Sequence, residues 1–247
     1  MLKKFYLFIA AILLFSTGTN AETNRAWKVG EKLEYRVYYA FFNAGTSTFL
    51  VEKEYQSSGR NIVQFKSVIQ SRSNFFVKIF DEALSVSDAN SYASLRYEKT
   101  QRERNEFSKN VTVFNNAAGQ AVRTEDGHAY PPMNYRRGSM DVLSAIYYVR
   151  SQDLSIGKTY TIPVHDGKRD YTMRVKAVGR ETVKTPAGTF DALKVEPKLY
   201  GEDGKLSKSG QMTLWMTDDD LHIPVRIRIS LKFGSMTADL LRSSGTK

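Results

Sequence analysis

The side chains that could perform acid–base or metal chemistry are few in this sequence and lie far apart. The three histidines are His128, His165 and His222, and no two of them have the spacing of metal ligands on one helix. The three consecutive aspartates at 218–220 lack the spaced carboxylates and central glycine of a calcium loop. Because the chain has no cysteine, thiolate metal sites and cysteine nucleophiles are excluded. We therefore expect no metal, no cofactor and no catalytic residue of a familiar kind, and we interpret the protein as a non-enzyme.

A group of polar residues lies within an otherwise apolar segment at 139–150. One interpretation directs Tyr148 and Arg150 toward the headgroup of a ligand, with Asp141 as their partner. The other makes Asp141 a negative charge at the N-terminus of a helix and Arg150 a positive charge at its C-terminus, where each complements the helix dipole. The second interpretation explains the same residues without a ligand and is favoured.

A second candidate is the basic stripe formed by Arg226, Arg228 and Lys232, which alternate with apolar residues near the end of the chain. Such a stripe could contact an anionic lipid or glycan. It is equally typical of the solvated face of an outer strand.

Apolar and polar residues alternate with a period of two in one segment after another, which is typical of strands buried on one face. The first strand should present Leu33, Tyr35, Val37, Tyr39 and Phe41 on one face. A turn at 43–45 should then lead to strands over 49–55 and 63–69. The pattern predicts a mainly β protein, with a curved antiparallel sheet of half-barrel or sandwich-like form and one covering helix near 139–150.

Three central segments are less regular. The stretch from Asn74 to Asp88 is compatible with a short helix or a buried irregular segment, and 95–107 is interpreted as a solvated edge strand. The turn-forming residues at 117–138 indicate a long loop. Ser139 is the expected cap of the helix that follows, whose apolar positions recur every three or four residues and indicate a face that packs on the sheet.

Regular hairpins return after Gly157. Turns at 166–167, 186–188 and 202–204 should connect strands, the last of which leads into Met212, Leu214 and Met216. The final strand is expected over 223–233. Since no linker or repeat interrupts the pattern, we expect a single domain over 22–247.

Residues 1–21 have the three parts of a secretory signal peptide: Lys3 and Lys4, an apolar run over 5–15, and small residues before Ala21. Cleavage after Ala21 would leave a protein that does not span the membrane, in the periplasm of a Gram-negative-type bacterium. Its charge would be 34 basic minus 26 acidic residues, or +8, since the whole chain has 36 and 26. This charge suits an anionic or amphiphilic envelope lipid, a glycan or an envelope protein, whereas nucleic acid is not expected outside the cell.

Five segments carry a resemblance to a known family. They are GEKLEY at 30–35, DVLSAIYYVR at 141–150, VGRETVKTPAGTF at 178–190, LWMTDD at 214–219 and IPVR at 223–226. In this order they resemble the exported bacterial proteins of domain of unknown function 3108, a family that implies no activity. The strand of Trp215, the acidic turn and Pro224 also resemble the closing hairpin of periplasmic lipoprotein carriers, which implies a curved sheet that holds acyl chains under a helical lid.

These observations lead to three hypotheses of function. The leading one is a periplasmic binding or carrier-like protein for an amphiphilic ligand, a lipid or a lipidated molecule, with Asp141, Tyr148, Arg150, Arg226 and Arg228 as candidate contacts. The second is a structural or protein-interaction module of the envelope that binds no small ligand. The third is an enzyme with an unfamiliar site.

Overall fold

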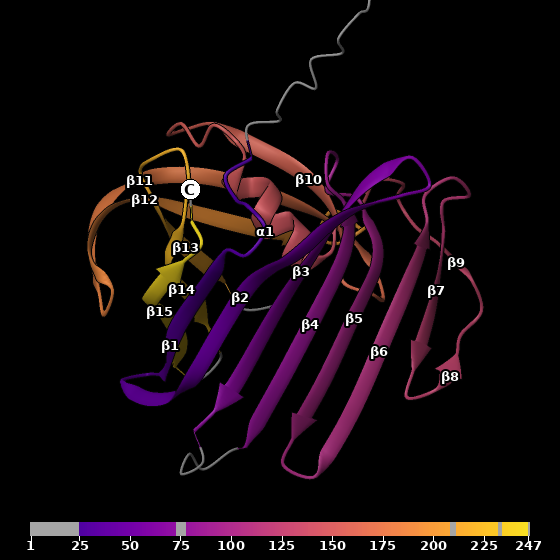
Figure 1. Ribbon diagram of the computed structural model, residues 1–247, viewed down its shortest axis with the longest axis horizontal. Coiled ribbons are helices and arrows are strands. Elements are labelled where there is room, and N and C mark those ends of the chain that lie inside the picture. The colour runs from indigo at the N-terminus through magenta and orange to yellow at the C-terminus, as the bar shows by residue number, and fades with distance from the viewer. Residues whose placement is uncertain (1–24, 73–77, 208–210, 232–233, 247) are drawn as a thin grey trace, which may run out of the picture.

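One continuous antiparallel sheet of 15 strands forms most of the protein. The computed structural model describes residues 25–72, 78–207, 211–231 and 234–246. The spatial order of the strands is β10-β11-β12-β13-β14-β15-β1-β2-β3-β4-β5-β6-β7-β8, and β9 pairs with β7. Figure 1 shows that the sheet curls into two walls, one carrying β1 to β6 and the other carrying β10 to β12. The predicted curved antiparallel sheet is confirmed.

The elements follow one another along the chain mostly as hairpins. The N-terminal half contains β1 (Lys32–Tyr39), β2 (Phe42–Ser57), β3 (Arg60–Ser71), β4 (Ile79–Asp88), β5 (Ser94–Glu103), β6 (Glu106–Asn115), β7 (Gln120–Glu125), β8 (His128–Ala129) and β9 (Met133–Asn134). After the only helix of the described residues, α1 (Val142–Arg150), come β10 (Thr159–His165), β11 (Asp170–Thr185), β12 (Gly188–Tyr200), β13 (Met212–Thr217), β14 (Pro224–Ser230) and β15 (Ser235–Ser244). This arrangement confirms the predicted hairpins after Gly157.

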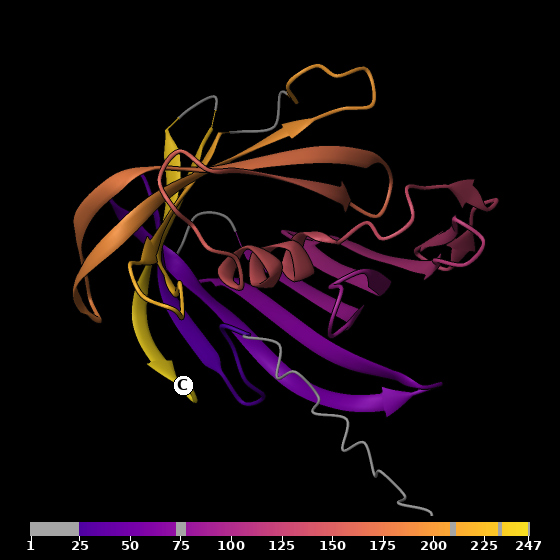
Figure 2. The ribbon, with the colours of Figure 1, turned by 90° about the horizontal axis from the view of Figure 1, so that it is seen from above.

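The helix α1 lies in the concave space between the two walls (Figure 2). Its Tyr147 ring stacks on Phe65 of β3, with ring centroids 4.0 Å apart. The buried Trp27 contacts both rings edge-on. This aromatic group anchors one side of α1 to the wall formed by β3 and β4, as expected for a helix with one apolar face.

The sheet remains open, with β10 and β8 at the two ends of its strand order. The turn between β10 and β11 nevertheless approaches the opposite wall, where the Thr112 hydroxyl of β6 donates to the Gly167 carbonyl over 3.0 Å. Met140, just before α1, forms an isolated bridge with Val164 of β10. These contacts hold the two walls around the helix.

Three central predictions were wrong. Residues 79–88 form strand β4 rather than a helix or an irregular segment, whereas residues 73–77 lie outside the described part of the chain. The segment 95–107 belongs to a hairpin of β5 and β6, and β5 is an interior strand between β4 and β6. The expected loop at 117–138 contains three short strands. β7 pairs with β6, and β8 and β9 pair with β7, so that the turn-forming residues lie between paired strands.

The first and last strands also differ from the prediction. The chain turns at Ala40 and Phe41 rather than at 43–45, because Ala40 adopts a left-handed backbone with φ of 52°. Gly45 instead lies within β2, where a Cβ atom would come 2.1 Å from the Gln70 carbonyl oxygen of β3. The final strand is β15, not β14, and it returns to pair with β1.

The predicted signal peptide at 1–21 lies outside the described residues, as do Lys232 and Phe233. In the part of the chain that the structure describes, no helix is long and apolar enough to cross a membrane.

Candidate functional site

The N-terminus of α1 is fixed by Asp141, which is fully buried. One carboxylate oxygen accepts hydrogen bonds from the backbone N–H groups of Leu143 and Ser144, at 2.9 and 3.0 Å. The other accepts from the hydroxyls of Ser85 and Ser94, both at 2.6 Å. Burial raises the pKa of Asp141, although these four hydrogen bonds act in the opposite direction. Asp141 is thus the N-cap that the sequence analysis assigned to Ser139.

The C-terminus of α1 is fixed by Arg150, whose side chain is 1% exposed. Its guanidinium forms a two-pronged ion pair with the equally buried Glu31, at 2.5 and 2.9 Å. It also donates to the carbonyl oxygens of Ala26 and Leu221. Burial alone would lower the pKa of Arg150, but the Glu31 carboxylate overrides this and raises it. Arg150 therefore connects the helix to the chain before β1 and to the loop before β14.

These contacts exclude the alternative in which Asp141 is the partner of Tyr148 and Arg150, and they agree with the favoured interpretation that places Asp141 and Arg150 at the two ends of the helix. Asp141 and Arg150 lie at opposite ends of α1 and have separate internal partners. The Tyr148 ring packs edge-on against Tyr92, with centroids 5.6 Å apart. A buried carboxylate and a buried guanidinium each need compensation close by, and Glu31 and the two serines provide it.

An apolar cavity of about 300 Å³ lies on the other side of the helix, between α1 and the wall of β10 to β14. Four helix residues with the spacing of one face line it: Val142, Ala145, Ile146 and Val149. A helix of nine residues is only about 14 Å long, because each residue rises by about 1.5 Å. Because its opposite side is packed on β3 and β4, α1 leaves the space beside β11 to β14 unfilled.

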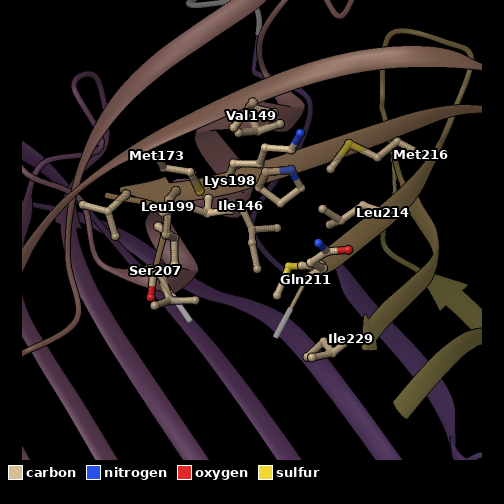
Figure 3. Close-up of a pocket in the computed structure, with 17 residues that line it drawn as sticks. Ile146, Val149, Met173, Lys198, Leu199, Ser207, Gln211, Leu214, Met216 and Ile229 are labelled. Carbon is tan, nitrogen blue, oxygen red and sulfur yellow. The ribbon is translucent and has the colours of Figure 1, made fainter. Parts of the chain in front are cut away.

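The far side of the cavity consists mainly of inward-facing side chains of the strands (Figure 3). They are Val164, Met173, Val175, Pro197, Leu199, Leu206, Leu214, Met216, Met212 and Ile229, with Lys198, Ser207 and Gln211 as the polar lining residues. Leu206 and Val142 are about half exposed, at 50% and 42%, so the cavity reaches the surface there. Its size lies at the lower end of the range of about 300–1,000 Å³ that is typical of ligand pockets.

A second, polar cavity of about 440 Å³ lies at the C-terminal end of α1. Its lining includes the aspartates at 218–220, Asp153 and His222. The His222 ring contacts the Arg150 carbonyl oxygen at 2.8 Å, and Asp219 accepts three hydrogen bonds from its own turn. Among the described residues, no group of three or more histidine, aspartate or glutamate side chains is arranged to hold a metal ion.

The predicted basic stripe lies on the outer face of β14. Arg226 pairs with Asp239 of β15 at 2.5 and 2.8 Å and donates to the Lys184 carbonyl oxygen. Arg228 is exposed, two residues further along the same face. None of the five predicted contacts lines the apolar cavity, because Arg226 and Arg228 face away from Ile229 and the other three face different parts of the fold.

The sequence analysis did not place this cavity, although it predicted the strand that carries three of the lining residues. Met212, Leu214 and Met216 were predicted to lie in the strand that follows the turn at 202–204, and all three lie in β13 and line the cavity. The signal that could have indicated a cavity is the concentration of methionine on this wall, at 173, 212 and 216, since methionine adapts to irregular or variable contacts.

The comparison with protein families gives one match, to the family described as a protein of unknown function (DUF3108), over residues 34–241. This match covers most of the chain. The protein belongs to the DUF3108 family. The resemblance carried by the five segments is thereby confirmed, and the matched range includes all of α1 and every residue that lines the apolar cavity. No curated protein is significantly similar to this DUF3108 chain.

Solved structures with a similar fold come from other bacterial proteins. A β-barrel-like protein of domain of unknown function DUF1849 from Brucella abortus superimposes with a TM-score of 0.56, at 10% identity, over 88% of this chain and 98% of that chain. At this identity the likeness shows the fold alone. A candidate lipoprotein from Parabacteroides distasonis (15% identity, 89% and 98% covered) and a candidate exported protein with a YmcC-like fold from Bacteroides fragilis (12%, 88% and 97%) both have TM-scores of 0.38, too low to carry an argument.

Proposed function

We propose that this DUF3108 protein is an exported, non-catalytic binding or carrier protein that holds the apolar part of an amphiphilic ligand, a lipid or a lipidated molecule, between α1 and the wall of β11 to β14. The observation that carries the proposal is the apolar cavity of about 300 Å³ that reaches the surface beside Val142 and Leu206. Export rests on the signal-peptide pattern of residues 1–21, and a periplasmic location is part of the proposal.

The chemistry of the lining supports an apolar ligand. Of the strand residues around the cavity, Met173, Met212 and Met216 have flexible side chains that can follow the shape of an acyl chain. Ordinary core packing leaves few voids larger than a water molecule, so an unfilled space of this size costs stability unless something occupies it. A ligand that enters the cavity would recover the lost contacts.

The first test is to express the full chain, purify it under native conditions and identify bound lipid by extraction and mass spectrometry. We expect a lipid at a molar ratio near one. In parallel, the ligand-free protein should bind a fluorescent fatty-acid analogue, and a natural lipid should displace it.

The matched variants are Met173→Trp and Lys176→Trp on strand β11. Met173 faces the cavity, whereas Lys176 is exposed on the other face of the same strand. A tryptophan at 173 should fill the cavity and lower probe affinity by about tenfold or more, without the loss of about 1–3 kcal/mol that overpacking a filled core causes. Lys176→Trp should bind like the wild type. Equal probe affinity in the two variants, or the absence of any bound lipid and any probe binding, would contradict the proposal.

A further inference from the structure

The exposed phenylalanines of the described residues all lie at one end of the sheet. Phe41 and Phe42, in the turn between β1 and β2, are 80% and 57% exposed. Their rings lie against each other, with centroids 4.3 Å apart, rather than against the core. Phe107, at the start of β6, is 54% exposed, and Leu231, after β14, is 41% exposed. The sequence pattern predicted Phe41 on the inner face, but the turn at Ala40 directs it into solvent.

Backbone hydrogen bonds connect the turns that carry these residues into one edge. Ala40 donates to the Ser235 carbonyl oxygen, which connects the β1–β2 turn to the start of β15. Further along the edge, the backbone N–H of Arg72 donates to the Ala44 carbonyl oxygen, and the backbone N–H of Arg104 donates to the Lys78 carbonyl oxygen, each over 2.9 Å. Figure 1 shows the ends of β1, β3 and β5 along the lower edge of the sheet. The aromatic residues therefore lie on a continuous edge of the molecule, which we call the aromatic edge.

The aromatic edge is also basic. It carries four exposed basic side chains: Arg72, Lys78, Arg102 and Arg104. Within the described ranges none of the four forms an ion pair, and Arg102 lies over the Phe107 ring at 5.8 Å. The exposed carboxylates nearest to them are Glu103 and Glu106 in the β5–β6 turn, so that turn is balanced, whereas the whole edge has four exposed basic side chains against two acidic ones.

A cluster of acidic residues lies at the other end of the sheet. The aspartates at 218–220 follow the end of β13, and with Asp153 they line the polar cavity at the C-terminus of α1. An anionic surface would attract the basic residues of the aromatic edge and repel this acidic cluster, which favours an approach with the aromatic edge forward.

The aromatic edge lies at the same end of the strands as Met212 and Ile229, two of the residues that line the apolar cavity. Ile229 lines the cavity and pairs with Met236 of β15, which pairs with Tyr39, next to the β1–β2 turn. Met212, another lining residue, pairs with Ile229. A ligand that passes from a surface bound at the aromatic edge to the cavity would reach it on the side of Met212 and Ile229.

We propose that the aromatic edge docks this protein on an anionic lipid bilayer, with Phe41 and Phe42 inserted among the lipid headgroups and Arg72, Lys78 and Arg104 against their phosphates. The geometry favours a bilayer over a protein partner, because the phenylalanines project from turn tips, whereas the residues that dominate protein interfaces lie in packed, desolvated patches. The docking surface stands on its own observations, and only its role in loading the cavity rests on the proposed function.

The test is cosedimentation of the protein, purified after expression of the full chain, with two kinds of vesicle. One kind contains phosphatidylcholine alone, and the other contains phosphatidylcholine with about one-third phosphatidylglycerol. We expect binding to the anionic vesicles that weakens in 0.5 M salt. The variant R72Q/K78Q/R104Q should bind roughly 100-fold more weakly at low salt, because each basic residue near an anionic surface contributes about fivefold. The variant F41S/F42S should lose about tenfold or more.

Matched controls use the opposite end of the same sheet. Tyr55→Ser changes an exposed aromatic residue near the other end of β2, and K28Q/R60Q/K184Q removes the same charge from exposed positions away from the aromatic edge. Both controls should bind anionic vesicles within about twofold of the wild type, and all variants should keep the affinity for the fatty-acid probe in the absence of vesicles.

The outcomes separate the two proposals. If the wild type fails to bind anionic vesicles, if the edge variants bind as well as their controls, or if Phe41 and Phe42 instead mediate a dimer in analytical ultracentrifugation, the docking proposal is overturned, whatever the probe shows. If vesicle binding follows the expected pattern but no probe or lipid enters the cavity, docking stands and the binding function fails.

Discussion

At the scale of single residues, the buried ion pair of Arg150 and Glu31 makes the sharpest prediction. Arg150→Met should lower the free energy of unfolding by about 3–5 kcal/mol, because Glu31 would remain buried without compensation. The double variant Glu31→Gln/Arg150→Met should recover most of that loss, since neither charge remains. Urea unfolding followed by tryptophan fluorescence measures both. If Arg150→Met lowered the free energy of unfolding by less than about 1 kcal/mol, Arg150 would not compensate a buried charge on Glu31.

At the scale of elements, the stability of α1 depends on its N-cap. Asp141→Ala should cost about 1–2 kcal/mol and speed hydrogen exchange at Leu143 and Ser144, whose N–H groups would lose their acceptor. Asp141→Asn keeps a cap oxygen and should retain protection at both amides. Native-state hydrogen exchange with mass spectrometry distinguishes the two variants. Because Val142 lines the cavity, a frayed first turn in Asp141→Ala should also weaken probe binding, and unchanged protection would contradict this role.

At the scale of the whole molecule, the pairing of β1 with β15 joins the two halves of the sheet. Arg242 of β15 pairs with Glu34 of β1, and this contact lowers the pKa of Glu34 to about 2 from an ordinary value of 4.5. The stabilisation is therefore full above pH 4.5 and is lost as the pH falls through 2. Glu34→Gln should cost no more than about 1 kcal/mol at pH 7, because Arg242 is largely exposed. The difference in unfolding free energy between the variant and the wild type should shrink in acid and in high salt, and a difference that grows in acid would contradict the assignment.

The period-two alternation was enough to predict the sheet and the C-terminal hairpins, and apolar residues at three- and four-residue spacing were enough to predict the helix, because these elements depend on residues close together in the sequence. Asp166–Gly167 and the turn at 186–188 connect strands as expected, and α1 ends at Arg150. Strand β15 escaped detection because its pairing with β1 contains a register shift between Glu34 and Tyr35, which breaks the regular alternation.

The candidate site could not be predicted in the same way, because it depends on contacts between residues far apart in the sequence. The partner of Arg150 is Glu31, 119 residues earlier, and nothing in the local pattern distinguishes that carboxylate from others. An inward-facing apolar residue likewise has the same pattern whether it fills a core or lines a cavity. The sequence alone therefore determined a curved β protein of the DUF3108 family with one helix. Only the tertiary structure decided that α1 packs against one wall and leaves a space beside the other, and that the turn at Ala40 exposes Phe41, because long-range packing sets both.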